Sequence, residues 1–270
     1  MKSFIKYTMA TVVGIFLTMT LFTIISIISL AGMMATEGMS APIKEKSILR
    51  LDLSGTLAER SDSNPFAALM GEENTALSLE DALLALDKAA KNENIIGVYL
   101  EGGAMGANPG MAQELRQALV EFKESGKWVV AYGDSYGKTA YYLSSVADSV
   151  LLNPEGNVDF GGMASQIMFY KDVMEKVGVK MQVFKVGTYK SAVEPFICTE
   201  MSPANREQVT SYLFSIWTNM LKDVAESRNM EVGKLNSLAD SLTMISEASV
   251  ALNGGLVDKL CYMDEGKAIL

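Results

Sequence analysis

Short apolar segments with strand-like patterns alternate with helix-like segments along most of this 270-residue chain, and this alternation limits the possible folds most strongly. Strands and helices at this spacing are typical of βαβ units and a largely parallel sheet. The sequence therefore predicts an α/β domain. We expect strands at 47–55, 95–103, 127–135, 149–154 and 179–187, and helices at 78–92, 110–126, 138–148, 166–178 and 202–229.

Local signals set several of the expected boundaries. Gly55 is expected to end the first strand, and residues 56–76 are expected to form a long loop. Ser78 can cap the following helix, with Asp81 at the capping-box position. Ser202, followed by proline, is the start signal of the long amphipathic helix near the C-terminus.

The N-terminus carries a long apolar run: residues 7–36 contain no charged side chain. About 20 apolar residues cross a bilayer core, whereas a signal-peptide core has ~7–15, so we favour a membrane anchor over a cleaved signal peptide. Lys2 and Lys6 precede the run, which predicts a cytoplasmic N-terminus. We expect a cytoplasmic end (1–8), a transmembrane anchor (9–34), a stem (35–46) and an exported domain (47–270).

Charge and composition exclude some classes of function. The net charge is −9, and because residues 1–46 carry +2, the remainder carries −11. An acidic domain without a Lys/Arg block argues against nucleic-acid binding. The chain has no histidine and two separated cysteines, Cys198 and Cys261, which argues against zinc. No metal or cofactor site is predicted, and nothing in the spacing requires a disulfide.

Without histidine, a Ser-His-Asp or Cys-His hydrolase is excluded from this chain, so lysine is the main candidate for a catalytic base. A free lysine is a poor base because its pKa lies near ~10.4, but burial lowers that value. Lys190 lies between the largely apolar stretch 183–186 and the small residues 192–193, which predicts a desolvated amine able to take a serine proton. The alternative is an ion pair with Glu194, four residues on, at a helix start.

The segment "VGTYKSAVEPF", followed by "MSPANREQ", resembles the one that holds the catalytic lysine in the long-form signal peptide peptidase A (protease IV) family. The similarity extends through "DSYGKTAYYLSSVADSVLLNPEGNVDFGGM" and the "LDLSG" strand after the anchor. The resemblance implies a Clp protease–crotonase-like fold in two related halves, with Lys190 as general base in the first and a serine nucleophile in the second. It also implies a tetramer on the outer face of the cytoplasmic membrane that degrades short apolar signal-peptide remnants.

One departure from the family pattern concerns the nucleophile. The Ser-Gly-Gly motif before an aromatic pair is not present, and the aligned slot in "GKTAYYL" holds Lys138. Ser135 and Ser191 do not fit the motif and are interpreted as turn and cap residues. The nucleophile is therefore expected in a C-terminal half outside this chain. The alternative is a catalytically incomplete, truncated or split half that binds peptides or assembles with a serine-bearing partner.

Weaker candidates for substrate contact are Gly102, Gly103 and Tyr141. Backbone N–H groups at the two glycines could hold a peptide carbonyl, although making a turn explains them more simply. Tyr141 is most simply a core residue. A crotonase-type acyl-CoA enzyme would share the fold class, but the exported location and the Lys190 segment argue against it.

Overall fold

The computed structural model describes residues 1–37, 42–60, 76–241 and 243–270. The chain divides into two compact units, Met1–Lys44 and Glu45–Leu270, which are described separately. The first contains helix α1 (Lys2–Glu37). Its stretch Ser3–Ser29 is long and apolar enough to cross a membrane, a criterion that an N-terminal signal sequence also meets. The boundaries of the anchor stay a prediction.

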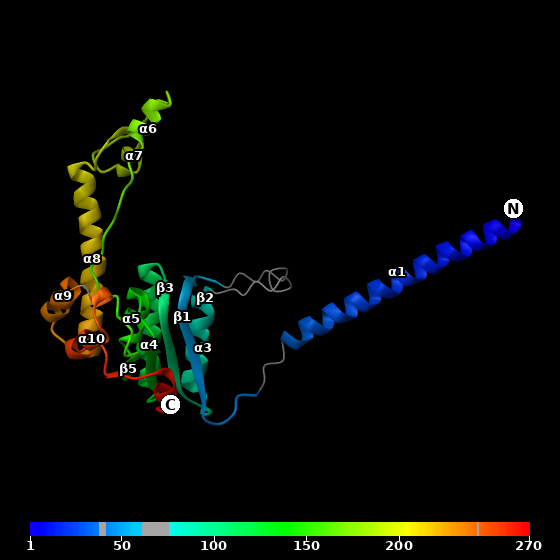
Figure 1. Ribbon diagram of the computed structural model, residues 1–270, viewed down its shortest axis with the longest axis horizontal. Helices are drawn as coiled ribbons and strands as arrows, with labels where there is room; N and C mark the ends of the chain where they lie inside the picture. Colours follow the sequence, from blue (N-terminus) through cyan, green and yellow to red (C-terminus); the bar gives the residue numbers. More distant parts are fainter. Residues whose placement is uncertain (38–41, 61–75, 242) are drawn as a thin grey trace. The chain divides into compact units, whose positions relative to one another are not determined.

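The second unit is built on a six-stranded sheet in the order β2-β1-β3-β4-β5-β6 (Figure 1). Every neighbouring pair of strands is parallel, which confirms the predicted α/β class. The strands are β1 (Ser47–Ala58), β2 (Ala76–Ser78), β3 (Ile95–Gly106), β4 (Trp128–Gly133), β5 (Ser149–Leu152) and β6 (Lys259–Leu260).

Alternate strand residues separate the core into two faces, because successive side chains of a strand point to opposite sides of the sheet. Val98 and Leu100 belong to the large apolar cluster that the helices cover. Tyr99 and Tyr132 belong to a smaller cluster on the other face.

The helices of this unit are α3 (Leu79–Lys91), α4 (Pro109–Glu124), α5 (Lys138–Ser144), α6 (Lys171–Lys176), α7 (Glu194–Ile197), α8 (Pro203–Arg228), α9 (Val232–Asp240), α10 (Ala248–Gly254) and α11 (Met263–Lys267), with 3-10 turns η1 (Ser191–Val193) and η2 (Thr243–Ile245).

The second half of α8 is fixed to the core by the buried side chain of Arg116 on α4. Its guanidinium donates to the Asp223 carbonyl (2.7 Å) and to Ser227 Oγ (2.6 Å), both on α8. It also donates to the Tyr142 carbonyl and to Ser145 Oγ (2.8 Å) at the end of α5. The guanidinium of Arg116 thus connects α4 to both α5 and α8.

Two predicted boundaries near the first strand were wrong. β1 does not stop at Gly55 but continues to Ala58, because Gly55 adopts a positive φ of 74° where the register with β3 shifts. Ala76 does not end a loop but begins β2, which pairs with the end of β1. The rest of the predicted loop, residues 61–75, lies outside the described residues. Ser78 Oγ accepts the Asp81 N–H at 3.2 Å, which confirms the cap of α3.

The largest difference from expectation lies between β5 and α8. The predicted helix 166–178 contracts to α6, and residues 179–187 form no strand. A strand needs a neighbour for its backbone hydrogen bonds, and no described strand pairs with this segment. Residues 164–200 are here called the arm: the segment rises alongside α8, and α6 and α7 lie at the N-terminal end of α8, away from the sheet (Figure 1).

Candidate functional site

Lys190 lies on the arm, directly before η1 and α7. Its side chain is exposed, and it makes no ion pair with any described carboxylate. The predicted ion pair with Glu194 is therefore wrong for this structure. Among the described residues, no side-chain hydrogen bond or ion pair holds the ammonium of Lys190 in a purely structural role.

Glu194 is engaged elsewhere, and its side chain is only 2% exposed. One carboxylate oxygen accepts from Ser202 Oγ at 2.6 Å, and the other accepts from the Ser202 N–H at 3.2 Å and from Asn205 Nδ2 at 2.9 Å. Burial alone raises the pKa of Glu194, but these hydrogen bonds outweigh burial and lower the pKa below its usual value. Glu194 is thus a charged acceptor at the first turn of α8.

The Glu194 contacts form an anchor for the segment after Lys190. Ser202 Oγ also accepts the Asn205 N–H at 3.2 Å, so the cap of α8 and the carboxylate share one hydroxyl. The Cys198 N–H donates to the Glu194 carbonyl at 2.8 Å, and the Tyr170 N–H donates to the Pro195 carbonyl at 2.6 Å. The backbone one turn beyond Lys190 is therefore fixed to α8, whereas the lysine side chain itself stays in solvent.

The predicted burial of Lys190 by its neighbours was wrong. Phe184 is 87% exposed and Val186 is 90% exposed, so they do not cover the amine. The reason is the missing strand: residues 179–187 pair with no described strand, and all of their apolar side chains except the half-buried Val183 are exposed. The amine of Lys190 is therefore open to solvent, and the contacts described within this chain do not desolvate it.

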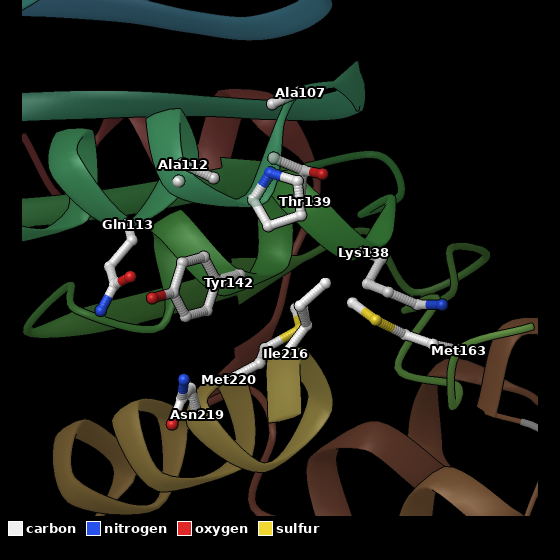
Figure 2. A pocket seen from close by; sticks show the side chains of 12 residues that line it. Ala107, Ala112, Gln113, Lys138, Thr139, Tyr142, Met163, Ile216, Asn219 and Met220 are labelled. Atoms are coloured by element: carbon white, nitrogen blue, oxygen red, sulfur yellow. The ribbon is translucent and has the colours of Figure 1, made fainter. Parts of the chain in front are cut away.

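The slot expected to correspond to a nucleophile lies on a different part of the fold, at the start of α5. Gly137 is the N-cap residue, and its N–H donates to the Gly103 carbonyl on β3 at 2.9 Å. Lys138 follows as the first helical residue, and its Nζ donates to the Gly162 carbonyl at 2.6 Å. Lys138 borders a cavity of about 250 Å³ between α4, α5 and α8 (Figure 2).

The structure places Gly102 and Gly103 inside β3 rather than in a turn after it, so the turn interpretation was wrong. Leu53 of β1 pairs with Gly102 of β3, and Gly55 pairs with Met105. Between these two pairs β3 has one residue more than β1, so the two glycines lie at an irregularity in the strand pairing. A Cβ at Gly102 would overlap the ring of Tyr136, so glycine is required there by packing.

Tyr141 is fully buried, and its hydroxyl donates to the Leu256 carbonyl at 2.8 Å. Burial raises the pKa of the phenol well above its usual range. This position agrees with a core role for Tyr141. Peptide contacts by Gly102, Gly103 and Tyr141 stay predictions that the described geometry does not support.

The described residues contain no group of three or more His, Cys, Asp or Glu side chains that could hold a metal ion. Cys261 is buried and Cys198 is half-buried, and neither forms a disulfide. The arm thus carries a free thiol, Cys198, as well as the Lys190 amine, and the hydrogen-bonded Glu194 carboxylate lies between them in the sequence.

A comparison with protein families shows which family this chain belongs to. The model described as peptidase family S49 matches residues 121–269, more than half of the chain and a range that includes both Lys138 and Lys190. The chain belongs to peptidase family S49. Its parallel six-stranded α/β domain is the ClpP-like fold of that family.

Three curated relatives of this S49 chain are named as proteases. Protease 4 of Salmonella typhi is 34% identical over 83% of this chain and 39% of its own length. Protease 4 of Haemophilus influenzae is 32% identical over 73% of this chain and 33% of its own length. The chloroplastic serine protease SPPA of Arabidopsis thaliana is 27% identical over 83% of this chain and 32% of its own length. The S49 chain thus spans less than two fifths of the length of each of these relatives.

Two features of this S49 chain were not found from the sequence. Glu194 was considered only as a partner of Lys190, because nothing local indicates that a carboxylate accepts from a cap eight residues ahead. The cavity beside Lys138 combines α4, α5, α8 and the segment around Met163, which are distant in sequence. Of the residues that hold Glu194, only Ser202 was indicated by the sequence, as part of the Ser202–Pro203 helix start.

Proposed function

We propose that this chain is the lysine-bearing half of a membrane-anchored serine peptidase of the Ser-Lys dyad type, with Lys190 as general base. The observation that carries the proposal is that Lys190 lacks a carboxylate partner among the described residues, although Glu194 lies four positions on. A lysine held in an ion pair is a poor proton acceptor, whereas an unpaired one becomes a base once it is desolvated. Membership of a peptidase family supports the same assignment.

The reaction is acyl transfer to a serine and then to water. Neutral Lys190 Nζ accepts the Oγ proton as Oγ attacks the peptide carbonyl, and the tetrahedral intermediate collapses to an acyl-enzyme. The lysine returns that proton to the departing amine. It then takes a proton from a water molecule that attacks the ester, and hands it back to the serine Oγ. We place the nucleophilic serine outside residues 1–270.

Desolvation of Lys190 then has to come from another protein surface. The arm exposes apolar side chains before and after α6, including Met168 (65%) and Phe184 (87%). Exposed apolar surface of this kind marks an interaction site. We assign its coverage to the serine-bearing half or to a neighbouring subunit of a homo-oligomer, a tetramer by family resemblance. Covering the arm would remove water from Lys190 at the same step that brings in the serine.

The proposed location follows from the N-terminal helix. Residues 1–8 would lie in the cytoplasm, 9–34 would cross the cytoplasmic membrane, 35–46 would form a stem, and 47–270 would lie on the exported side. Substrates would be short apolar peptides at the membrane surface, such as remnants of cleaved signal peptides.

A second candidate is a catalytically incomplete half that binds peptides or assembles with a partner. The observation in its favour is Lys138, which stands where the resemblance expects a nucleophile and lies beside a cavity. This candidate shares the fold and the arm with the first, and differs in having no turnover even with a serine-bearing partner.

Cleavage of a fluorogenic apolar peptide by the protein together with its serine-bearing half tests the proposal. Lys190→Ala and Lys190→Arg should each lower kcat by roughly 10²–10⁴-fold, because alanine and the permanently charged arginine cannot accept a proton. Lys180→Ala, which removes another exposed lysine of the arm, is the matched control and should cleave normally. Unchanged turnover in Lys190→Ala refutes the base assignment. An inactive unmodified pair supports the second candidate.

A further inference from the structure

The cavity beside Lys138 has an apolar interior and a polar rim (Figure 2). The ring of Tyr142 and the side chains of Met163, Ile216 and Met220 line its middle. Lys138 lies at one end of the view, and the amides of Gln113 and Asn219 lie at the other. A small apolar space with a few polar groups at its edge is the usual construction of a ligand site.

Lys138 gives this cavity an uncompensated positive charge. Its ammonium carries three donors, and the hydrogen bond found for it goes to the neutral Gly162 carbonyl. No described carboxylate lies within ion-pair distance of Lys138, and none lines the cavity. In a chain of net charge −9, a cation left without a counter-ion at the edge of an apolar space favours an anionic ligand with an apolar body.

The size of the cavity limits what that apolar body can be. A cavity of roughly 150 Å³ holds one benzene molecule, and drug-sized ligands need roughly 300–1,000 Å³. A volume of about 250 Å³ therefore admits one large aliphatic or aromatic side chain with its own backbone. Met163 and Met220 are flexible enough to fit side chains of different shape.

The amides define the rest of the ligand. Gln113 and Asn219 are exposed, and each can both donate and accept a hydrogen bond. A peptide backbone offers one donor and one acceptor per residue, which matches amide side chains. A simple fatty acid offers nothing to them beyond its carboxylate.

We propose that the Lys138 cavity binds the C-terminal residue of an apolar peptide, with the terminal carboxylate on Lys138 and the side chain against Tyr142, Met163 and Met220. Choosing a peptide rests on the proposed peptidase function, while the binding itself requires neither Lys190 nor a serine. The cavity would hold the carboxyl end of a substrate, or of a product, on the lysine-bearing half.

Direct binding to the full-length protein in detergent, in a Lys190→Ala background, tests this inference without interference from cleavage. The probe is an N-terminally fluorescent tetrapeptide ending in leucine, offered as the free acid and as the C-terminal amide, with octanoate as competitor. We expect the free acid to bind about tenfold or more tightly than the amide, the size of one charge-assisted hydrogen bond. Lys138→Met should lower the affinity for the acid to that for the amide, and Lys138→Arg should retain the preference.

Lys222→Met, which removes an exposed lysine of α8 outside the cavity, is the matched control and should bind like the parent. Equal affinity for acid and amide, or an unchanged preference in Lys138→Met, overturns the proposal. Octanoate that competes as well as the free peptide acid overturns the peptide assignment. Because binding is read without turnover, failure of Lys190 as a base in the cleavage assay leaves this result unaffected.

Discussion

Replacing Glu194 with glutamine tests whether the anchor behind Lys190 holds the arm on α8. The side chain keeps its shape, but the carboxylate that accepts three hydrogen bonds becomes a neutral amide with one oxygen. A hydrogen bond to a charged group contributes about 1.5–3 kcal/mol, and at least one bond to Ser202 or Asn205 is lost.

A cost of about 1.5–3 kcal/mol is roughly a 10- to 150-fold shift toward a released arm. Amide hydrogen exchange reads this shift directly, because the Tyr170 and Cys198 N–H groups bond to the backbone of 194–195. We expect both amides to exchange faster by that factor in Glu194→Gln, while amides of β3 and β4 are unchanged. Peptide turnover should fall with them, mainly in kcat, since the lysine base is placed less often.

The pH dependence has a defined sign. The pKa of Glu194 is lowered in the folded protein, so its contribution is present above the ordinary glutamate value of 4.5 and is lost as the pH falls through the lowered pKa. The difference in exchange between the parent and Glu194→Gln should therefore shrink in acid. Glu200→Gln, an exposed change on the same segment, is the control. Normal exchange and normal turnover in Glu194→Gln at pH 7 would show that the carboxylate does not hold the arm.

Two further predictions concern residues that contact the sheet. Gly102→Ala should destabilise the domain by about 1–3 kcal/mol in urea unfolding, because its methyl meets the buried ring of Tyr136, whose hydroxyl is held by the Leu151 carbonyl at 2.8 Å. Gly233→Ala, with open space on α9, should instead gain about 0.5–1 kcal/mol, and equal effects would contradict the packing argument. Asp258→Asn should lower stability at pH 7, because the Asp258 carboxylate accepts from Arg228 at 2.7 Å and from the Val150 N–H at 2.7 Å. These bonds outweigh burial and lower the Asp258 pKa, so the difference should vanish as the pH falls through it, and a difference that persists in strong acid would refute the assignment.

Elements with strong local signals could be predicted from the sequence. β3, β4 and β5 are apolar runs followed by helices, and they form as expected. α3 and α8 begin at their predicted serine caps. The two shortest strands could not be predicted in this way, since β2 and β6 contain three and two residues and owe their existence to the neighbours they pair with.

The candidate site was harder to predict because its residues interact across the chain. The segment around Lys190 was found from its resemblance, but the apolar residues that predicted burial carry no information about what covers them. Residues 179–187 have the composition of a strand and no described strand to pair with, so pattern and structure disagree there. The contacts of Glu194 and the walls of the Lys138 cavity both include side chains of α8, which is distant in sequence from α4 and α5.

Helix α8 is attached at both of its ends, so it acts as a spacer of fixed length between the arm and the core. Its first turn holds Glu194 through Ser202 and Asn205, and its last turns hold Arg116 through Asp223 and Ser227. Its 26 residues at about 1.5 Å each span about 39 Å, and a stiff rod of fixed length sets how far the arm stands from the sheet. One residue inserted into α8 would rotate one attachment by about 100° relative to the other, so both the reach and the phase of the helix are specified. The length of α8 therefore sets the distance between the sheet and the arm that carries Lys190.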